Sequence, residues 1–599
     1  MEAEGEPEPS EQPTPSEQPE PSEQPEPEPV TAPKEEQNNA DISNTGVRSL
    51  RPQGGRETAG SPDMLEAPMT PPMSPPMPAM FQDGFPAVTP GLIKNMSLFV
   101  MMDLSSNGIG AATSAKLGSE LRQNDTVLVL DLSSNKIKDD GASTIAHALE
   151  YNTTLQSINF AGNMVGAVGA ERLAAALRVN SSLETLNMAR NKLGDDGARR
   201  LAQGVEKNGS LQKIELGWND ISDEGAGRLA GALSINTSLQ KVDLSGNKIG
   251  AYGAGRLAAA LEKNTSVKSL HLSGNDVRDD GAVKLADALQ TSTTLTSLYL
   301  QRNNIGPDGM GRLAGALCGN TSLKHLNLGW NAMGDGGVRP LARALAENSN
   351  LETLNVAGNR IGPYGAERLA GSILLNNSLT SLNVSYNTVS HSGSKKMADA
   401  LEKNTTIQSL NLTLNQIGGV GTEHLAKVLQ HTNTTLRVLN LQLNRVGDDG
   451  ATALADVLKV NDSLETLVLH GNNIGDVGAV KLGAALAVNK KLSTLDLSVN
   501  NICVQGASKI ADALLMNSTL RALTLKLNKV GQAGCFKFGA AMEHNDTLQV
   551  LDLSENGSLP METLHRIQQQ CAYNLAAYEA VHGGGEAMMS PMTMGHTEA

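Results

Sequence analysis

The segment LKHLNLGWN at residues 323–331 decides the fold, because its pattern recurs along most of the chain. Residues 239–247 read LQKVDLSGN, and both segments follow LxxLxLxxN. The last asparagine of the pattern occurs seventeen times, and fifteen of the sixteen intervals are 28 residues long. The interval from Asn415 to Asn444 is 29 residues, because QHTNTTL at 430–436 holds one additional residue. This regularity predicts a repeat array. Its expected structural ladder is Asn107, Asn135, Asn163, Asn191, Asn219, Asn247, Asn275, Asn303, Asn331, Asn359, Asn387, Asn415, Asn444, Asn472, Asn500, Asn528 and Asn556.

Each unit predicts one short strand followed by one helix. In the LxL of the strand, Leu326 and Leu328 face one side and the residue between them faces the other. A glycine stands six positions after the asparagine in fifteen of the seventeen units. The segment GAGRLAGAL at 225–233 then places Leu229 and Leu233 on one helical face. Because a single unit cannot cover its own apolar face, we expect neighbouring units to supply the cover.

The recurring asparagine has a structural explanation. Its amide has a donor and an acceptor, so it can satisfy backbone groups in the turn of its own unit and in that of the next. A missing amide would leave a buried group unpaired, at a cost of about 1–3 kcal/mol. The end units depart from the pattern, with Thr113 in the first and Glu562 in the last where glycine is usual, and with Ser558 where an aliphatic residue is usual. Such departures are expected of capping units.

The pattern resembles the leucine-rich repeats of the ribonuclease-inhibitor-like class, over about residues 95–580. The resemblance implies an α/β solenoid, a horseshoe of about 17 strand–helix units with parallel strands on the concave face. The curvature agrees with the packing distances, since strands stack ~4.8 Å apart and helices need ~8–10 Å. We therefore expect a leucine-rich repeat domain at 95–581 with capped ends, between a tail at 1–94 and a tail at 582–599.

Both tails are predicted to be disordered. Residues 1–90 hold 17 acidic and 4 basic side chains and 20 of the 25 prolines, and PSEQP recurs every six residues in 9–25. This composition has too little apolar surface to offset the entropy of ordering. Residues 66–80 are rich in Met and Pro. Two interpretations stay open, a solubilising spacer or a ligand for a proline-recognising domain with phosphorylation at Thr70 and Ser74.

Several classes of protein and site are excluded by composition. The residues after position 90 carry almost no net charge, which argues against a nucleic-acid partner. No apolar stretch approaches the ~20 residues of a membrane helix, and MEAEGEPEPS lacks the features of a secretory signal. The four cysteines form no CxxC pair, which favours a reducing, cytoplasmic compartment, with a cilium or the cytoskeleton as the alternative. We expect no cofactor and no metal, and we interpret all four thiols (Cys318, Cys503, Cys535 and Cys571) as structural.

The position directly before the ladder asparagine carries the candidate partner-binding residues. It reads Gly-Arg-Trp-Gly in four successive units, and the same series recurs 112 residues later, which is four units of 28. Trp and Arg are common interface anchors. We predict a recognition rim at Arg190, Trp218, Arg302, Trp330 and Tyr386, with Tyr299 and His325 nearby. The alternative is a duplicated packing tryptophan that covers a neighbouring glycine. At the same position, Leu414, Leu443 and Leu527 form a second, apolar candidate.

Two further patterns have structural and functional interpretations. Acidic pairs such as Asp139-Asp140 and Asp279-Asp280 follow many ladder asparagines. Stacked carboxylates could share a divalent cation, but acids one or two positions before a helix also favour its positive end. Sequons such as the one at Asn236 recur at the helix-to-strand turn, and we interpret them as repeat chemistry.

The resemblance also suggests a function. Uniform units with GDDGA and GAxxLAxAL are similar to the repeats of NOD-like receptors, but no GxxxxGK[ST] supports nucleotide-driven assembly. Ran GTPase-activating proteins and axonemal repeat proteins share the repeat type. We predict a non-enzymatic scaffold that binds a protein partner, a small GTPase being one candidate, on the concave face and strand-end rim. The alternatives are a Ran-type GTPase activator and a ciliary or axonemal scaffold.

Overall fold

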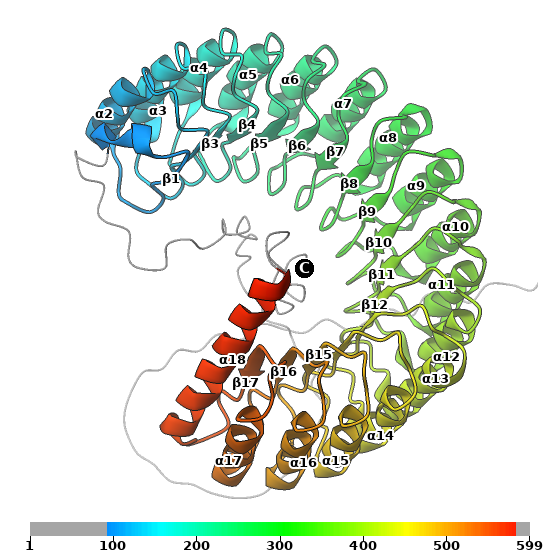
Figure 1. Cartoon of the computed structure of the whole chain (residues 1–599). Coiled ribbons are helices and arrows are strands. Elements are labelled where there is room, and N and C mark those ends of the chain that lie inside the picture. Colours follow the sequence, from blue (N-terminus) through cyan, green and yellow to red (C-terminus); the bar gives the residue numbers. More distant parts are fainter. Residues whose placement is uncertain (1–92, 583–599) are drawn as a thin grey trace, which may run out of the picture. The chain divides into compact units, whose positions relative to one another are not determined.

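The computed structural model describes residues 93–582, all of which belong to one compact unit of the chain. The predictions for residues 1–92, including PSEQP, Thr70 and Ser74, lie outside the described residues, as do those for residues 583–599. Within the described part, strands and helices alternate from the first unit to the last (Figure 1).

Seventeen strands of three residues each are found in residues 93–582. They are β1 Met101–Asp103, β2 Val129–Asp131, β3 Ser157–Asn159, β4 Thr185–Asn187, β5 Lys213–Glu215, β6 Lys241–Asp243, β7 Ser269–His271, β8 Ser297–Tyr299, β9 His325–Asn327, β10 Thr353–Asn355, β11 Ser381–Asn383, β12 Ser409–Asn411, β13 Val438–Asn440, β14 Thr466–Val468, β15 Thr494–Asp496, β16 Ala522–Thr524 and β17 Val550–Asp552.

A helix follows each strand, and a short 3-10 helix, η1 Met96–Leu98, precedes the first. The helices are α2 Ala111–Leu121, α3 Lys138–Leu149, α4 Ala167–Leu177, α5 Gly194–Val205, α6 Asp223–Leu233, α7 Ala251–Leu261, α8 Arg278–Thr291, α9 Pro307–Gly319, α10 Gly334–Glu347, α11 Pro363–Leu375, α12 Ser390–Leu401, α13 Gly418–His431, α14 Gly447–Leu458, α15 Asp476–Leu486, α16 Val504–Leu514, α17 Gly531–Met542 and α18 Met561–His582.

Every strand pairs in parallel with the strand of the next unit, and equivalent residues are partners. Leu326 of β9, for example, pairs with Leu298 and Leu354 on its two sides. The strands line the inner side of the arc and the helices the outer side (Figure 1). One continuous hydrophobic core runs from Ile93 to Cys571 between these two layers. The solenoid of 28-residue strand–helix units is therefore confirmed.

From Asn135 onward the ladder asparagines form a buried column of hydrogen bonds, but they reach the preceding unit rather than the next. Asn135 accepts from the backbone N–H groups of Asn107 and Ile109, each at 2.9 Å. Its Nδ2 donates to the carbonyl of Leu104 at 2.9 Å and to that of Leu132 in its own unit. The backbone N–H groups of the turn in one unit therefore find their acceptor in the asparagine of the following unit.

A second asparagine column lies at the turn from each helix to the next strand. Asn180 donates to the carbonyls of Leu149 and Asn152 in the preceding unit, and it accepts from the backbone N–H of Leu183 at 2.8 Å. This outer ladder holds Asn152, Asn180, Asn208, Asn236, Asn264, Asn320, Asn348, Asn376, Asn404, Asn433, Asn461, Asn489, Asn517 and Asn545, all of them buried. The asparagine side chains of the recurring sequons are therefore engaged in turn hydrogen bonds.

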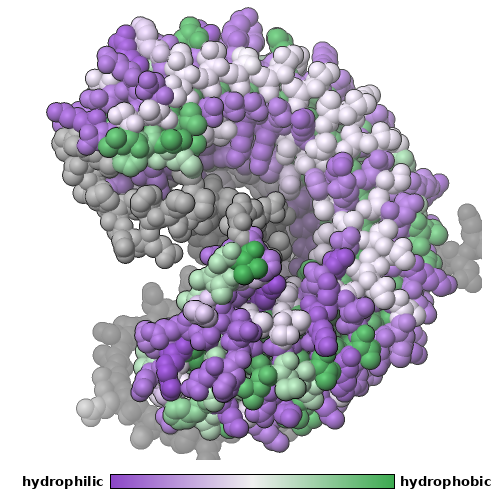
Figure 2. All heavy atoms as spheres, viewed as in Figure 1, coloured by the Kyte–Doolittle hydropathy of each residue, from purple (hydrophilic) through white to green (hydrophobic). Residues whose placement is uncertain are grey.

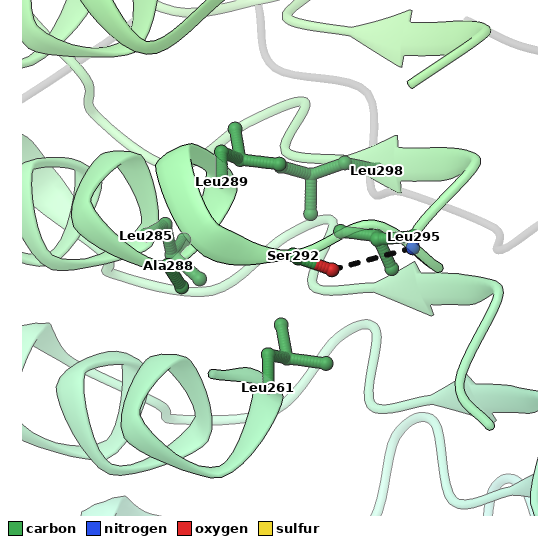
Figure 3. A pocket seen from close by; sticks show the side chains of 7 residues that line it. All are labelled: Leu261, Leu285, Ala288, Leu289, Ser292, Leu295 and Leu298. Carbon is green, nitrogen blue, oxygen red and sulfur yellow. Dashed lines mark hydrogen bonds between the residues drawn. The ribbon is translucent and has the colours of Figure 1, made fainter. Parts of the chain in front are cut away.

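The outer ladder has one interruption, at Ser292, which stands where the pattern places asparagine. Its hydroxyl accepts from the backbone N–H of Leu295 at 3.3 Å (Figure 3). It provides no amide to donate to the carbonyls of Leu261 and Asn264 in the preceding unit. A packing gap lined by Leu261, Leu285, Ala288, Leu289, Ser292, Leu295 and Leu298 lies at this point and leaves no room for a water molecule.

The acidic pairs lie inside the first helical turn, not before it as the sequence suggested. The Asp139 carboxylate in α3 accepts from the backbone N–H groups of Gly166 and Gly169, at 2.6 and 3.0 Å, and so caps α4 of the next unit. Asp195, Asp223, Asp279 and Asp448 do the same in their units. Each of these carboxylates lies in the first turn of its own helix and accepts hydrogen bonds from the first turn of the next helix. This favours the structural interpretation of these acids.

The glycine six residues after the ladder asparagine is required by packing. A Cβ atom at Gly281 would lie 2.7 Å from Cγ1 of Val277 and 3.1 Å from the backbone of Ala251. The buried aliphatic of the same unit therefore occupies the space that any larger residue would need.

The last unit ends in the long helix α18, which packs on α17 and β17. Its buried residues are Thr563, Ile567, Cys571 and Asn574. Asn574 donates to the carbonyls of Asn545 and Leu548 and so extends the outer ladder by one step. The helix thus covers the final unit, and its outer side exposes the apolar residues Met561, Tyr573, Leu575 and Val581.

The four cysteines differ in exposure. Cys535 and Cys571 are buried, and burial raises the pKa of both thiols, that of Cys571 to about 11. Cys318 is exposed at the end of α9, and Cys503 is half-buried at the start of α16. These two positions lie at helix ends on the outer layer, where the repeat has no buried side chain.

Candidate functional site

The residue directly before each ladder asparagine adopts a left-handed backbone conformation in every unit. Five of these residues are glycines and twelve are not, and all seventeen have φ between 54° and 69°. They are Ser106, Ser134, Gly162, Arg190, Trp218, Gly246, Gly274, Arg302, Trp330, Gly358, Tyr386, Leu414, Leu443, Gly471, Val499, Leu527 and Glu555. The turn geometry of the repeat therefore imposes a positive φ at this position.

This conformation disfavours the large side chains that stand there. Left-handed backbone costs an L-residue with a Cβ about 1–2 kcal/mol, whereas glycine adopts it freely. Trp330 has φ 56°, Tyr386 54°, Leu414 54° and Leu443 56°. The backbone conformation alone would favour glycine at each position, so the bulky side chains must contribute through packing or recognition.

Three of the predicted residues form one cluster at the strand ends. The Trp330 and Tyr386 rings have centroids 5.0 Å apart and are tilted by 47°. The Arg302 guanidinium lies 5.3 Å from the centre of the Trp330 ring, within the range of a cation–π contact. Trp330 and Arg302 are half-buried and Tyr386 is 37% exposed. The cluster presents two aromatic faces and one cation at the accessible edge of the array.

The tryptophans also pack on neighbouring glycines, as the alternative interpretation proposed. A Cβ atom at Gly358 would lie 2.6 Å from the Trp330 ring, and one at Gly246 would collide with the Trp218 ring. Packing and recognition are compatible here, because each ring uses one face on glycine and stays half-buried. The two tryptophans differ in their next neighbour, which is Tyr386 for Trp330 but Gly274 at the equivalent position for Trp218.

Tyr299 lies on the inner wall and stacks on a histidine that the sequence analysis did not single out. The rings of His271 and Tyr299 are 4.0 Å apart and nearly parallel, because the two residues are partners in the register of β7 and β8. Burial lowers the pKa of His271 from 6.5 to about 4. The Asp243 carboxylate opposes this shift, and the ammonium groups of Lys241 and Lys213 reinforce it. The 28-residue spacing of His271 and Tyr299 was the signal available in the sequence.

The other predicted residues lie at two places. His325 is on β9 in the unit of Trp330, and its Nδ1 is 2.9 Å from the Thr353 hydroxyl. Arg190 and Trp218 stand four units before Arg302 and Trp330 and so form a separate group. The structure therefore brings together one half of the predicted rim and separates it from the other half.

The second candidate patch continues the cluster. Trp330, Gly358, Tyr386, Leu414 and Leu443 occupy the strand-end position in five successive units, and we call them the apolar rim. Leu443 extends over Gly471 of the next unit as Trp330 extends over Gly358. Leu527 stands three units beyond Leu443 and is separate from the apolar rim. Two predicted patches thus form one continuous strip.

The inner wall beside the apolar rim is polar. Where it is visible, its side chains are hydrophilic (Figure 2). Asn355, Asn383, Asn411 and Asn440 are half-buried on four neighbouring strands and are paired in register. No cluster of three or more metal-ligating side chains occurs among residues 93–582. In the same range, no helix has the length and apolarity needed to cross a bilayer.

Comparisons with known proteins agree with this architecture. The model described as "NLRC3 LRR domain" matches residues 205–562, more than half of the chain, and "Leucine Rich repeat" matches residues 123–146, 151–174 and 179–202. No curated protein matches the chain.

Two solved structures align with part of the chain. "Leiomodin-1 Actin-Binding Site 2 (ABS2)" is 22% identical, covers 21% of this chain and 75% of its own, and has a TM-score of 0.20. The tropomodulin C-terminal domain of Caenorhabditis elegans is 18% identical, covers 27% of this chain and 97% of its own, and has a TM-score of 0.25. Leucine-rich repeat families are in general binding scaffolds without catalysis. On its repeat pattern, its solenoid and the match over 205–562, the chain belongs to the family of NLRC3-type leucine-rich repeat domains.

Proposed function

We propose that this protein is a non-enzymatic interaction scaffold that binds a protein partner along the apolar rim, the Arg302 side chain and the adjoining inner wall. Tyr299 and His325 contribute at the periphery of the same surface, whereas Arg190 and Trp218 form a separate group outside it. The observation that carries the proposal is the set of bulky residues at positive φ in a turn where glycine is tolerated.

An energetic argument separates recognition from packing. Trp330, Tyr386, Leu414 and Leu443 each carry a left-handed penalty of about 1–2 kcal/mol. None of the four is fully buried, so the apolar burial that each gains in the free protein is partial. A partner that covered the exposed remainder would supply the missing burial. Trp, Tyr and Arg are the residues that most often dominate such contacts.

The rigidity of the array favours the same function. The two asparagine ladders fix each unit to the one before it, so the spacing of the rim residues is set before a partner arrives. A preformed surface loses little conformational entropy on binding. The inner wall then contributes hydrogen bonds and shape rather than apolar area, because its outward positions hold mostly Asn, Ser and Thr.

Affinity capture from cells that express the protein tests the proposal. The full-length chain is compared with Trp330→Gly combined with Tyr386→Gly, and with Trp218→Gly as the matched control outside the apolar rim. Because glycine suits the left-handed turn, all three chains are expected to fold. We expect the double variant to lose the partners that the parent and the control retain, whereas equal recovery by all three would reject the proposal.

The alternative of a Ran-type GTPase activator has its own test. Single-turnover GTP hydrolysis by Ran is measured with and without the full-length chain. We expect no acceleration, and a rate increase that requires the chain would replace the scaffold proposal with an enzymatic one.

A further inference from the structure

The inner wall beside the apolar rim carries no formal charge over five units. In the units of β9 to β13, the positions one, two, four and six residues before the ladder asparagine hold no Asp, Glu, Lys or Arg. The nearest charged residues at these positions are Arg302 in the unit of β8 and Asp496 in the unit of β15, since the unit of β14 is also uncharged. We call this part of the wall the neutral window. At these positions a ligand meets no charged side chain until it reaches Arg302 at the edge of the window.

Five asparagines stand four residues before the ladder asparagine in the neutral window; Asn327 is buried, and the other four form a row of oriented donors. In each of Asn355, Asn383, Asn411 and Asn440, Oδ1 accepts the backbone N–H two residues later, at 2.9–3.0 Å. Only oxygen can accept from an N–H, so this bond fixes which way the amide points. The Nδ2 groups donate to no acceptor within residues 93–582, and none is a buried atom without a partner. We call these four residues the amide row.

From this geometry, and on the basis of the proposed function, we infer that the neutral window and the apolar rim bind a proline-rich segment of a partner protein in the polyproline II conformation. Proline has a carbonyl and no N–H, so a proline-rich chain offers acceptors without donors. The amide row offers donors whose acceptors are already used. An ordinary extended peptide would bury N–H groups against this row without partners, which is costly.

The spacing of the two surfaces is compatible. Three residues of polyproline II advance by about 9.3 Å. Two strand spacings measure about 9.6 Å. A proline-rich chain lying across the strands therefore brings an equivalent carbonyl to every second asparagine of the amide row. Asn355 and Asn411, and likewise Asn383 and Asn440, are separated by two strands.

The apolar rim supplies the second element of such recognition. Pyrrolidine rings dock on aromatic faces in known polyproline-binding grooves. Trp330 and Tyr386 form an aromatic pair at one end of the neutral window, and Leu414 and Leu443 continue it in the next two units. A polyproline helix exposes pyrrolidine rings and backbone carbonyls. The apolar rim can contact the rings, and the amide row can donate to the carbonyls.

Binding of decaproline to the full-length chain tests the inference. A rhodamine-labelled, C-terminally amidated decaproline is titrated and followed by fluorescence anisotropy, with a labelled ten-residue Gly-Ser peptide as the comparison. The test variant is Asn383→Asp with Asn411→Asp, which removes two donors. Aspartate keeps the turn bond, because Asp243 and Asp496 make the same bond to the backbone in their units. Asn187→Asp on β4 is the matched control outside the window.

We expect saturable binding of decaproline, weaker binding of the Gly-Ser peptide, and a loss of about tenfold or more in the double variant with none in the control. Absent binding, equal binding of both peptides, or an unaffected double variant would overturn the inference. Self-association through the window, abolished by the double variant, would show that a second copy fills it and would also overturn the inference. If decaproline fails while capture still depends on Trp330 and Tyr386, the proposed function stands without this ligand.

Discussion

Replacing Ser292 with asparagine is expected to stabilise the array, because it restores the missing step of the outer ladder. The backbone at Ser292 has φ −70° and ψ 125°, and Asn320 in the next unit has φ −78° and ψ 128°. Asparagine therefore fits the position without a change in the main chain. The packing gap beside Ser292 marks where the ladder is interrupted (Figure 3).

The expected gain follows from the hydrogen bonds that are restored. Asn320 donates to the carbonyls of Leu289 and Ser292, at 2.7 and 3.3 Å. Asparagine at 292 would donate in the same way to the carbonyls of Leu261 and Asn264. Two bonds contribute about 1–3 kcal/mol, and ordering the longer side chain removes part of this. We expect a net gain of about 1–2 kcal/mol.

Hydrogen exchange followed by mass spectrometry is the chosen assay, because it reports the opening of each unit separately and so localises the effect of one residue. Peptides that cover α7, α8 and β8 are expected to exchange about tenfold more slowly in Ser292→Asn, since 1.4 kcal/mol corresponds to a factor of ten. The reverse change, Asn320→Ser, should accelerate exchange by a similar factor in the peptides that cover α8, α9 and β9. Unchanged exchange in both variants would refute the role assigned to the outer ladder.

Three further predictions concern single positions. Asn331→Ala should cost about 2 kcal/mol more stability than Asn359→Ala. The reason is that the Asn331 oxygen accepts two backbone N–H groups, whereas the Asn359 oxygen has no partner. Urea unfolding of both variants measures the difference, and equal losses would contradict it. Burial lowers the pKa of His271 to about 4, so the unfolded chain binds the proton first and stability is lost as pH falls from about 6.5 to 4. Thermal unfolding across this range should show a smaller loss in His271→Gln, and an identical loss would refute the assignment. Asp279→Ala should destabilise the protein by about 1–2 kcal/mol, because it removes the cap of α9. Asp280 is exposed, so Asp280→Ala should change stability by no more than about 0.5 kcal/mol in the same unfolding assay. Similar losses at both positions would be inconsistent with the cap.

Much of the fold was predictable because the repeat itself is the signal. The 28-residue period fixes which residues are equivalent, so the parallel register of Leu298, Leu326 and Leu354 follows directly from the sequence. The stacking of units also followed, since one strand and one helix cannot bury their own apolar faces. The period did not reveal that the ladder asparagines form hydrogen bonds with the preceding unit.

Contacts between units were harder to foresee. Asp139 caps a helix that begins 28 residues later, and nothing local distinguishes it from the exposed Asp140. The outer ladder was present in the sequence as recurring sequons such as that of Asn236, but a sequon does not show where its side chain points. Both features depend on the three-dimensional offset between units, which only the structure supplies.

The candidate site was predictable as residues but not as a surface. The repeated Gly-Arg-Trp-Gly series identified Arg302 and Trp330, yet the contact of the Trp330 ring with Tyr386, two units further on, came only from the structure. The positive φ at these positions could not be inferred from Trp, Tyr or Leu, which rarely adopt it. His271 was missed because a lone histidine carries no motif.

The central claim is that the large residues of the apolar rim serve recognition rather than stability. The most direct measurement is the unfolding free energy and partner capture of one variant, Leu414→Gly combined with Leu443→Gly, beside the core control Leu410→Ala. Relief of the left-handed strain should offset the lost contacts, so we predict a change within about 1 kcal/mol together with reduced capture. The core control should lose about 2–5 kcal/mol. A rim variant that lost as much stability as the control, or that kept its partners, would contradict the account.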